Sequence, residues 1–137
     1  MEIPRPLKGI TILLVDDDPK HLQRFGSSLT VKGAEVYLAE DGQEALEQLY
    51  NGLRPDLVAT DLDMPRRRGN ELIEAVRAGG SGLEGIEQIP FLVISGAFTQ
   101  KIITALEQQG GVDCLMRGTF GSGQMVETIL KLLGEQN

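Results

Sequence analysis

Three carboxylates directly follow two short apolar runs of the sequence. Asp16 and Asp17 follow the run at 10–15, and Asp61 follows the run at 56–60. Such runs, alternating with helical patterns, are typical of buried parallel strands, whose carboxyl ends meet at the edge of a sheet where ligands bind. Three like charges at one edge repel one another and raise at least one pKa unless a cation neutralises them. Mg²⁺ held by carboxylates, water and a phosphate would do so, and the pattern therefore indicates phosphate chemistry.

The composition predicts one ordinary globular domain. Of the 137 residues, 41% are hydrophobic, which is enough for a single core. The formal net charge of −7 disfavours nucleic acid as a partner, since the only dense basic run, at 66–68, is too short to form a binding face. One cysteine, Cys114, excludes an internal disulfide and fits a reducing cytoplasm. The sequence shows neither a signal-peptide apolar region nor a bilayer-length apolar run, so we predict a cytoplasmic protein without a membrane partner.

Apolar runs and helical patterns alternate five times along the chain. Residues 1–8 are expected to form a short leader, and residues 9–137 one domain. Strands are predicted at about 10–15, 34–39, 56–60, 90–95 and 112–116. Helices are predicted at about 19–32, 42–50, 70–78, 99–109 and 124–133. Five βα units in sequence favour a doubly wound α/β fold, (βα)5, in which helices cover both faces of a five-stranded parallel sheet.

Local signals support these boundaries. Asp18 precedes Pro19 as an N-cap precedes the first helical position, and Asp41 has capping-box spacing to Glu44. The glycine-rich residues 79–85 lack the order of a phosphate-binding loop and are expected to form a mobile connection.

The most specific segments are Leu14-Val15-Asp16-Asp17 and the run at 56–65, together with the spacing to Gly69 and to the apolar segment at 89–96. In order and spacing, these motifs resemble the receiver domain of two-component response regulators, over roughly residues 9–134. The resemblance implies a flavodoxin-like fold with strand order 2-1-3-4-5.

The resemblance also implies roles for individual residues. Asp61 matches the phosphoacceptor of the family, and Asp16 and Asp17 match the acidic pair that helps to bind Mg²⁺. Asp63 occupies the position whose backbone carbonyl is a metal ligand, and Ser95 matches the Ser/Thr whose hydroxyl contacts the phosphoryl group. The implied protein is a switch rather than an enzyme, with slow autodephosphorylation at most. Its implied partners are a sensor histidine kinase or phosphotransfer protein and a downstream signalling protein, and it is expected to be a monomer or weak homodimer.

The sequence departs from the family pattern in two places. Receivers normally carry a Lys after the fifth strand, and that position falls on Arg117 or, with a shift of one residue, on Gly118. Arg117 could replace the Lys by neutralising phosphoryl oxygens, although its planar fork is longer and differently directed. The aromatic residue usual in the fifth strand is replaced by Cys114 or Leu115. The metal-binding and acceptor half of the site is therefore retained, while the half that reads out phosphorylation is altered.

These departures leave two other hypotheses open. A degenerate receiver could serve as a phosphorylation-independent interaction module. The D-x-D spacing of Asp61 and Asp63 also occurs in phosphohydrolases similar to haloacid dehalogenases, although those enzymes carry the motif on their first strand.

Other residues have simpler interpretations. We expect the arginines at 66–68 to lie in a solvated loop, His21 to be an exposed helix residue and Cys114 to be a small buried hydrophobe. Phe98, with Ile102 and Ile103 nearby, is predicted to expose apolar surface for a partner.

Overall fold

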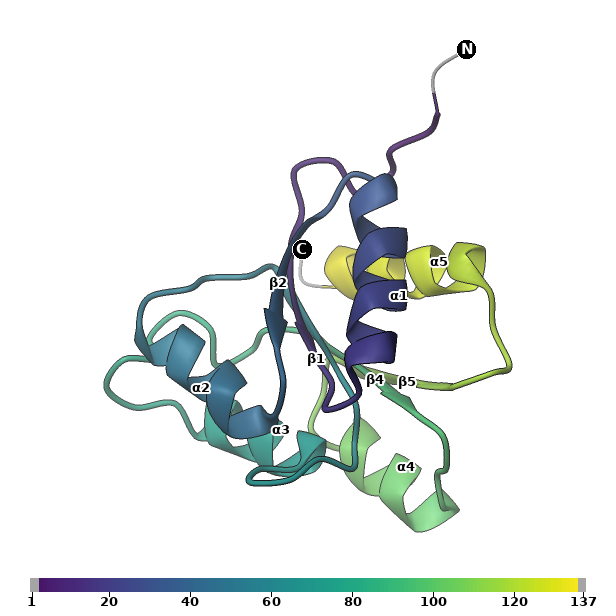
Figure 1. Ribbon diagram of the computed structural model, residues 1–137. Helices are drawn as coiled ribbons and strands as arrows, with labels where there is room; N and C mark the ends of the chain where they lie inside the picture. The colour runs from purple at the N-terminus through teal and green to yellow at the C-terminus, as the bar shows by residue number, and fades with distance from the viewer. Residues whose placement is uncertain (1–2, 136–137) are drawn as a thin grey trace.

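A computed structural model describes residues 3–135, and the predicted leader residues 1 and 2 lie outside that range, as do residues 136 and 137 (Figure 1). Within the described range, five parallel strands form one sheet in the order β2-β1-β3-β4-β5, and five helices flank it. The strands are β1 (Thr11–Val15), β2 (Glu35–Ala39), β3 (Leu57–Thr60), β4 (Phe91–Ser95) and β5 (Val112–Met116). The helices are α1 (Pro19–Val31), α2 (Gly42–Tyr50), α3 (Gly69–Ala78), α4 (Gln100–Glu107) and α5 (Ser122–Gly134). This confirms the predicted doubly wound fold and strand order.

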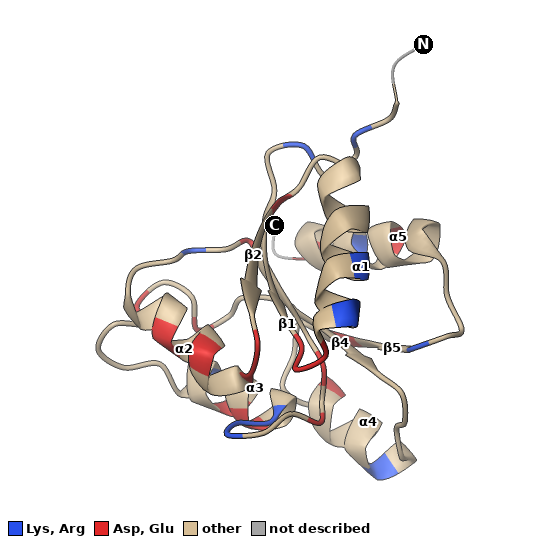
Figure 2. Ribbon diagram, in the orientation of Figure 1, with Lys and Arg blue, Asp and Glu red and all other residues tan. Residues whose placement is uncertain are grey.

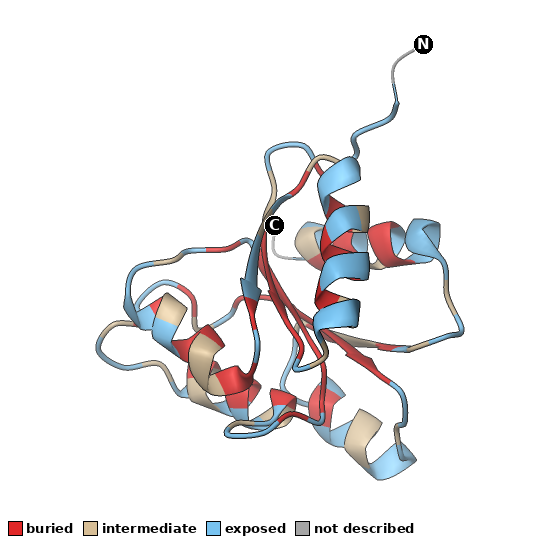
Figure 3. Cartoon of the chain, viewed as in Figure 1, coloured by how far each residue is buried: buried red, intermediate tan, exposed pale blue. Residues whose placement is uncertain are grey.

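The sheet separates two hydrophobic cores, because successive strand residues point to opposite faces. In β1, Ile12 and Leu14 pack with residues of α1 and α5, whereas Leu13 and Val15 pack with residues of α2, α3 and α4. The central strands β3 and β4 are buried throughout, and β2 is an exposed edge strand (Figure 3). Burial on both faces explains why the inner strands have continuous apolar sequences.

The predicted starts of α1 and α2 are confirmed by their caps. Asp18 accepts a hydrogen bond from the backbone N–H of Lys20 (2.8 Å), with Pro19 at the first helical position. Asp41 accepts one from the backbone N–H of Glu44 (2.8 Å). The ends of α4 and α5 differ from the prediction by about two residues, as is usual for helix termini. Among the helices of residues 3–135, none is long and apolar enough to cross a bilayer.

Two segments are more closely packed than their sequences suggest. Leu7, within the predicted leader, is fully buried beside α1, and its backbone N–H donates to the carbonyl of Lys32 (2.9 Å). The glycine-rich segment was expected to be a mobile connection, but Leu83 is fully buried and Gly82 lies against the ring of Tyr50. The apolar residues between the glycines anchor this segment to the core, so the expectation of a loose link is wrong.

Candidate metal and phosphoacceptor site

The sheet register brings the three acidic residues together. Val15 of β1 pairs with Thr60 of β3, so the residues that follow, Asp16 and Asp61, leave neighbouring strands at the same edge. Carboxylate oxygens of Asp16, Asp17 and Asp61 lie within 4.8 Å of one another. Asp16 and Asp61 are buried and Asp17 is exposed, which leaves the group open to solvent on one side. The three carboxylates predicted to share a site therefore do lie together.

Burial makes two of the three carboxylates, those of Asp61 and Asp16, costly to ionise. It raises the pKa of Asp61, and the nearby charge of Asp16 raises that pKa further. Burial also raises the pKa of Asp16, although a hydrogen bond from the backbone N–H of Asp18 (2.9 Å) acts in the opposite direction. A bound divalent cation would offset both effects, and hard carboxylate oxygens are the donors that Mg²⁺ and Ca²⁺ prefer. The donor set therefore fits a hard divalent cation, for which the carboxylates of Asp16, Asp17 and Asp61 would be ligands.

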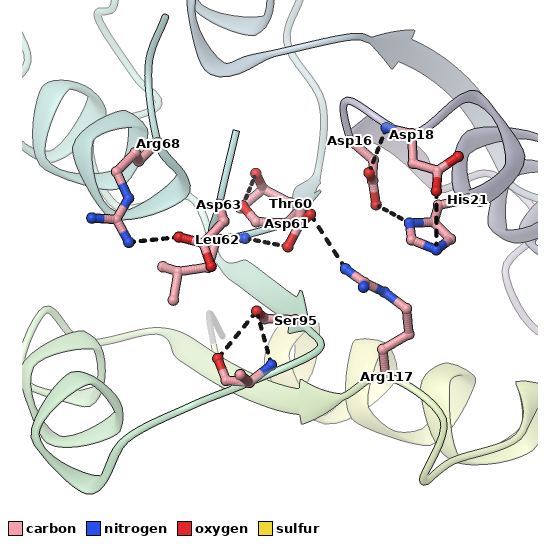
Figure 4. A network of polar contacts seen from close by, with 11 residues as sticks. Asp16, Asp18, His21, Thr60, Asp61, Leu62, Asp63, Arg68, Ser95 and Arg117 are labelled. Carbon is pink, nitrogen blue, oxygen red and sulfur yellow. Dashed lines mark hydrogen bonds and ion pairs between the residues drawn. The ribbon is translucent and has the colours of Figure 1, made fainter. Parts of the chain in front are cut away.

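Arg117 reaches Asp61. Its Nη2 lies 3.2 Å from Oδ2 of Asp61, and its side chain is 23% exposed (Figure 4). The residue is held at the end of β5 because its backbone N–H donates to the carbonyl of Ser95 (2.8 Å). Of the two positions that sequence alignment left open, Arg117 therefore supplies the positive charge, whereas Gly118 forms a turn with φ of 87°.

Ser95 ends β4 close to this group. Its hydroxyl is buried, donates to the carbonyl of Ala97 (3.2 Å) and also accepts a 3.4 Å contact from the Ala97 backbone N–H. It belongs to the strand that pairs with that of Asp61, and Figure 4 shows it below Asp61 and to the left of the Arg117 side chain. The hydroxyl thus holds the first residues of the β4–α4 loop.

Asp61 is held in place by its own neighbours. Its Oδ1 accepts from the backbone N–H of Leu62 (2.7 Å), and the hydroxyl of Thr60 donates to its carbonyl (2.8 Å). Gly69, the first residue of α3, lies against the same carbonyl: a Cβ at this position would be 2.2 Å from the Asp61 oxygen. A glycine is therefore required where α3 begins, which explains the spacing noted in the sequence.

Hydrogen bonds attach the β3–α3 loop to the residues around it. Arg66, at φ 65°, donates through Nε and Nη2 to the two oxygens of Asp41 (2.7 and 3.2 Å), and Arg68 donates to Asp63 (2.7 Å). The backbone N–H of Gly42 donates to the carbonyl of Arg67 (3.1 Å). The arginines are largely exposed, as expected for a solvated loop, and they also pair with neighbouring residues. They attach the loop that carries Asp63 to the start of α2.

His21 is the residue that the sequence interpretation missed. Its Nδ1 lies 3.2 Å from Oδ2 of Asp16 and its Nε2 lies 3.5 Å from Oδ2 of Asp18, with the side chain 20% exposed. The prediction of an exposed helix residue is therefore wrong. The available signal was its position three residues after an N-cap aspartate, which places it over the first turn of α1 and beside the carboxylates.

The remaining candidate residues lie away from the carboxylates. Cys114 is half-buried, and burial raises the pKa of its thiol to about 11, as suits an unreactive packing residue. Phe98 and Ile102 are half-buried and pack against the core on the α4 side, so part of each side chain is covered. A partner surface there stays a prediction.

The fold and these residues define a family. Residues 12–129 match the sequence model of the protein family called response regulator receiver domain, and the chain belongs to this family. Receiver domains are switches of two-component signalling rather than enzymes, they typically use Mg²⁺, and they interact with histidine kinases or phosphotransfer proteins. The D-x-D spacing of Asp61 and Asp63 thus belongs to a receiver and not to a dehalogenase-like phosphohydrolase.

Curated relatives agree with this assignment. The chain is 33% identical over 129 residues to the regulator of RpoS of Escherichia coli K12, covering 94% of this chain and 36% of that protein. It is 31% identical over 122 residues to hybrid signal transduction histidine kinase D of Dictyostelium discoideum, covering 89% of this chain and 7% of that protein. The chain therefore spans about a third or less of the length of these two relatives.

Solved structures show the same fold. The Vibrio cholerae chemotaxis protein CheY4 is 26% identical and superposes with a TM-score of 0.77. The superposition covers 90% of this chain and 98% of that one. A response regulator receiver protein from Pseudomonas putida is 24% identical and superposes with a TM-score of 0.78. The superposition covers 96% of this chain and 99% of that one.

Proposed function

We propose that this receiver accepts a phosphoryl group on Asp61 from a phosphohistidine donor and so acts as a signalling switch. The observation that carries the proposal is the group of three carboxylates within 4.8 Å, with Arg117 on the acceptor. Mg²⁺ bound by Asp16, Asp17, Asp61 and the backbone carbonyl of Asp63 would neutralise charge on the transferred phosphoryl group. In the transfer, an oxygen of Asp61 bonds to phosphorus while the phosphorus–nitrogen bond of the donor breaks.

The residues of the chain position the reaction rather than act as strong bases. The Leu62 N–H holds Oδ1 of Asp61, which leaves Oδ2 on the side of Arg117. The Arg117 guanidinium would then donate to phosphoryl oxygens in place of the usual Lys, and the Ser95 hydroxyl would turn from Ala97 toward the same group. Attack of water on phosphorus breaks the bond to the Asp61 oxygen, restores the carboxylate and resets the switch.

The partners follow from this role. A sensor histidine kinase or phosphotransfer protein would supply the phosphoryl group, and a downstream signalling protein would bind one of the two states. Since such donors act in the cytoplasm, we place the protein there, as a monomer or weak homodimer.

Intact-mass measurement tests the proposal. Incubation with acetyl phosphate and Mg²⁺ is expected to add the mass of one phosphoryl group, and Asp61→Asn or addition of EDTA is expected to abolish it. Asp63→Asn is the matched control, because it removes a carboxylate but leaves the proposed backbone ligand. Absence of the adduct in the wild-type protein, with no binding of beryllofluoride, would contradict the proposal.

One observation favours a second candidate, a phosphorylation-independent interaction module. The acceptor oxygen Oδ2 of Asp61 already lies 3.2 Å from a guanidinium, an arrangement that could hold a single conformation without phosphate. This candidate predicts that Asp61→Ala leaves partner binding unchanged, whereas the switch predicts a clear gain or loss.

A further inference from the structure

The imidazole of His21 lies between two carboxylates of the β1–α1 loop. Nδ1 faces Oδ2 of Asp16 at 3.2 Å, and Nε2 faces Oδ2 of Asp18 at 3.5 Å (Figure 4). Asp16 belongs to the group of three carboxylates that fits a cation, whereas His21 does not belong to that group. His21 therefore lies one layer behind the proposed ligands, in contact with one of them.

The helix fixes the position of this ring. Asp18 caps α1 through the backbone N–H of Lys20 (2.8 Å), and His21 follows three residues later on the first turn. On the next turn the Phe25 ring lies 6.1 Å from the His21 ring, centroid to centroid, and Phe25 is itself buried. The two carboxylates and the neighbouring Phe25 ring leave the imidazole little freedom to turn.

His21 in turn restricts Asp16. One carboxylate oxygen of Asp16, Oδ1, accepts from the backbone N–H of Asp18 (2.9 Å), and the other, Oδ2, faces His21. A carboxylate with one oxygen hydrogen-bonded and the other 3.2 Å from an imidazole nitrogen has little room to rotate about its last side-chain bond. Nδ1 of His21 is buried and has no hydrogen-bond partner among the described residues, and Oδ2 of Asp16, at 3.2 Å, is an acceptor within its reach.

We infer that His21 is a positioning residue, which orients the Asp16 carboxylate toward a divalent cation shared with Asp17 and Asp61. This inference rests on the proposed function, because it requires that the three carboxylates bind Mg²⁺. Partners that orient metal ligands are typically worth about 10- to 100-fold in metal affinity. For Nδ1 to donate to Asp16 it must carry a proton. One of the two neutral tautomers of histidine has that proton, and so does the imidazolium form.

Mg²⁺ titration of three single variants, followed by NMR of the backbone amides, tests the role. His21→Leu removes the donor, and His21→Asn keeps a short N–H donor on the same turn. Gln23→Leu, on the exposed side of the same helix, is the control for placing leucine on α1. We expect His21→Leu to weaken Mg²⁺ binding about tenfold or more, as for other such partners, and His21→Asn and Gln23→Leu to stay within about threefold of the wild type. Thermal unfolding without Mg²⁺ would show whether each variant folds.

The outcomes separate this inference from the proposed function. If the wild-type protein binds no Mg²⁺, both are overturned. If it binds Mg²⁺ and His21→Leu binds equally well, the inference alone fails. It also fails if His21→Asn binds as weakly as His21→Leu, since loss of ring packing rather than of the donor would then be responsible. Electron paramagnetic resonance with Mn²⁺ in place of Mg²⁺ tests a direct role. A nitrogen hyperfine coupling that disappears in His21→Leu would show that His21 is a metal ligand, which also overturns a positioning role.

Discussion

Arg117 and Asp61 form an ion pair, and the proposed phosphoryl transfer depends on it. Burial and the charge of Asp16 raise the pKa of Asp61, and the Arg117 charge acts against both. In the proposed function an acyl phosphate forms from the ionised carboxylate, so the guanidinium would favour the reactive form of Asp61 before transfer and would stabilise the phosphoryl oxygens during transfer. One residue would then have two roles.

Arg117→Ala is therefore expected to slow phosphorylation by acetyl phosphate about tenfold or more, since charge-assisted hydrogen bonds are the strong ones and removing such a donor from a transition state has effects of that order. Arg117→Lys keeps the charge on a shorter chain, so its phosphorylation rate should lie between those of Arg117→Ala and the wild type. A time course of the phosphoryl adduct by intact mass measures both. Arg24→Ala, on the exposed side of α1 and stacked on Phe25, is the control. Equal rates for Arg117→Ala and the wild type would show that the guanidinium has no part in transfer.

The carboxylates could be predicted from sequence, whereas their supporting residues could not. Asp16, Asp17 and Asp61 each follow an apolar run, and the periodicity of a parallel sheet places all three at one edge. The contact of His21 with Asp16 depends instead on the direction in which α1 leaves its cap. The pairing of Arg66 with Asp41 joins residues 25 positions apart across a loop with no regular pattern. Such pairs leave no periodic signal in the sequence.

At the scale of elements, the β3–α3 connection positions the site. Figure 2 shows acidic residues gathered where β1 and β3 end, with the basic residues of this loop beside them. Helix α3 begins directly against the acceptor strand: the Gly69 N–H donates to the carbonyl of Leu62 (2.9 Å), and its Cα faces the carbonyl of Asp61. The loop is also attached to α2 through Arg66 and Asp41. The arrangement of the proposed metal site therefore depends on close backbone packing as well as on its carboxylates.

Gly69→Ala is expected to destabilise the protein by about 1–3 kcal/mol, the usual cost of overpacking. The added methyl would meet a backbone oxygen at 2.2 Å, which no change of rotamer can relieve, so the Asp61 carbonyl or α3 must move. Urea unfolding measures the loss, and Mg²⁺ affinity should fall with it.

Gly123→Ala is the matched control, because it also lies near the start of a helix and a Cβ there meets nothing within 4 Å. Alanine is a better helix former than glycine, so this variant should be as stable as the wild type or slightly more so. Equal stability of the two variants would mean that Gly69 is not constrained by the acceptor strand.

Element types and most boundaries could be predicted because the periods agree with the caps. Continuous apolar runs indicated β3 and β4, and Asp18 with Pro19 indicated the start of α1. The packing of the segment at 79–85 could not be predicted in this way. Its glycines suggest a loose link, but Leu83 enters the core between them, and a single buried residue has no period.

At the scale of the molecule, the two cores lie on opposite faces of the sheet, and long connections between strands are attached to the ends of the sheet. Arg77 at the end of α3 does this for the amino end of β4. Its guanidinium donates to the carbonyls of Glu87 (3.0 Å), Ile89 (2.7 Å) and Gly110 (2.9 Å), and stacks on the Phe91 ring at 5.2 Å. Three segments distant in sequence are thereby joined at the edge of the sheet opposite the carboxylates.

Arg77→Met should therefore destabilise the fold by about 2–4 kcal/mol, because it leaves backbone carbonyls without their donor in a half-buried position. Arg54→Met is the matched control. Arg54 also donates to three carbonyls, including that of Gly82, but it is exposed, so water can replace it and the loss should be under about 1 kcal/mol. Urea unfolding at pH 7 compares the stabilities of the two variants.

Mg²⁺ binding should be unaffected by the loss of Arg77. Since the joined segments lie at the far end of the strands, Arg77→Met at temperatures where it is folded should still bind Mg²⁺ as the wild type does. Equal losses for the two variants, or a large loss of Mg²⁺ affinity in Arg77→Met, would contradict this separation of stability from the site.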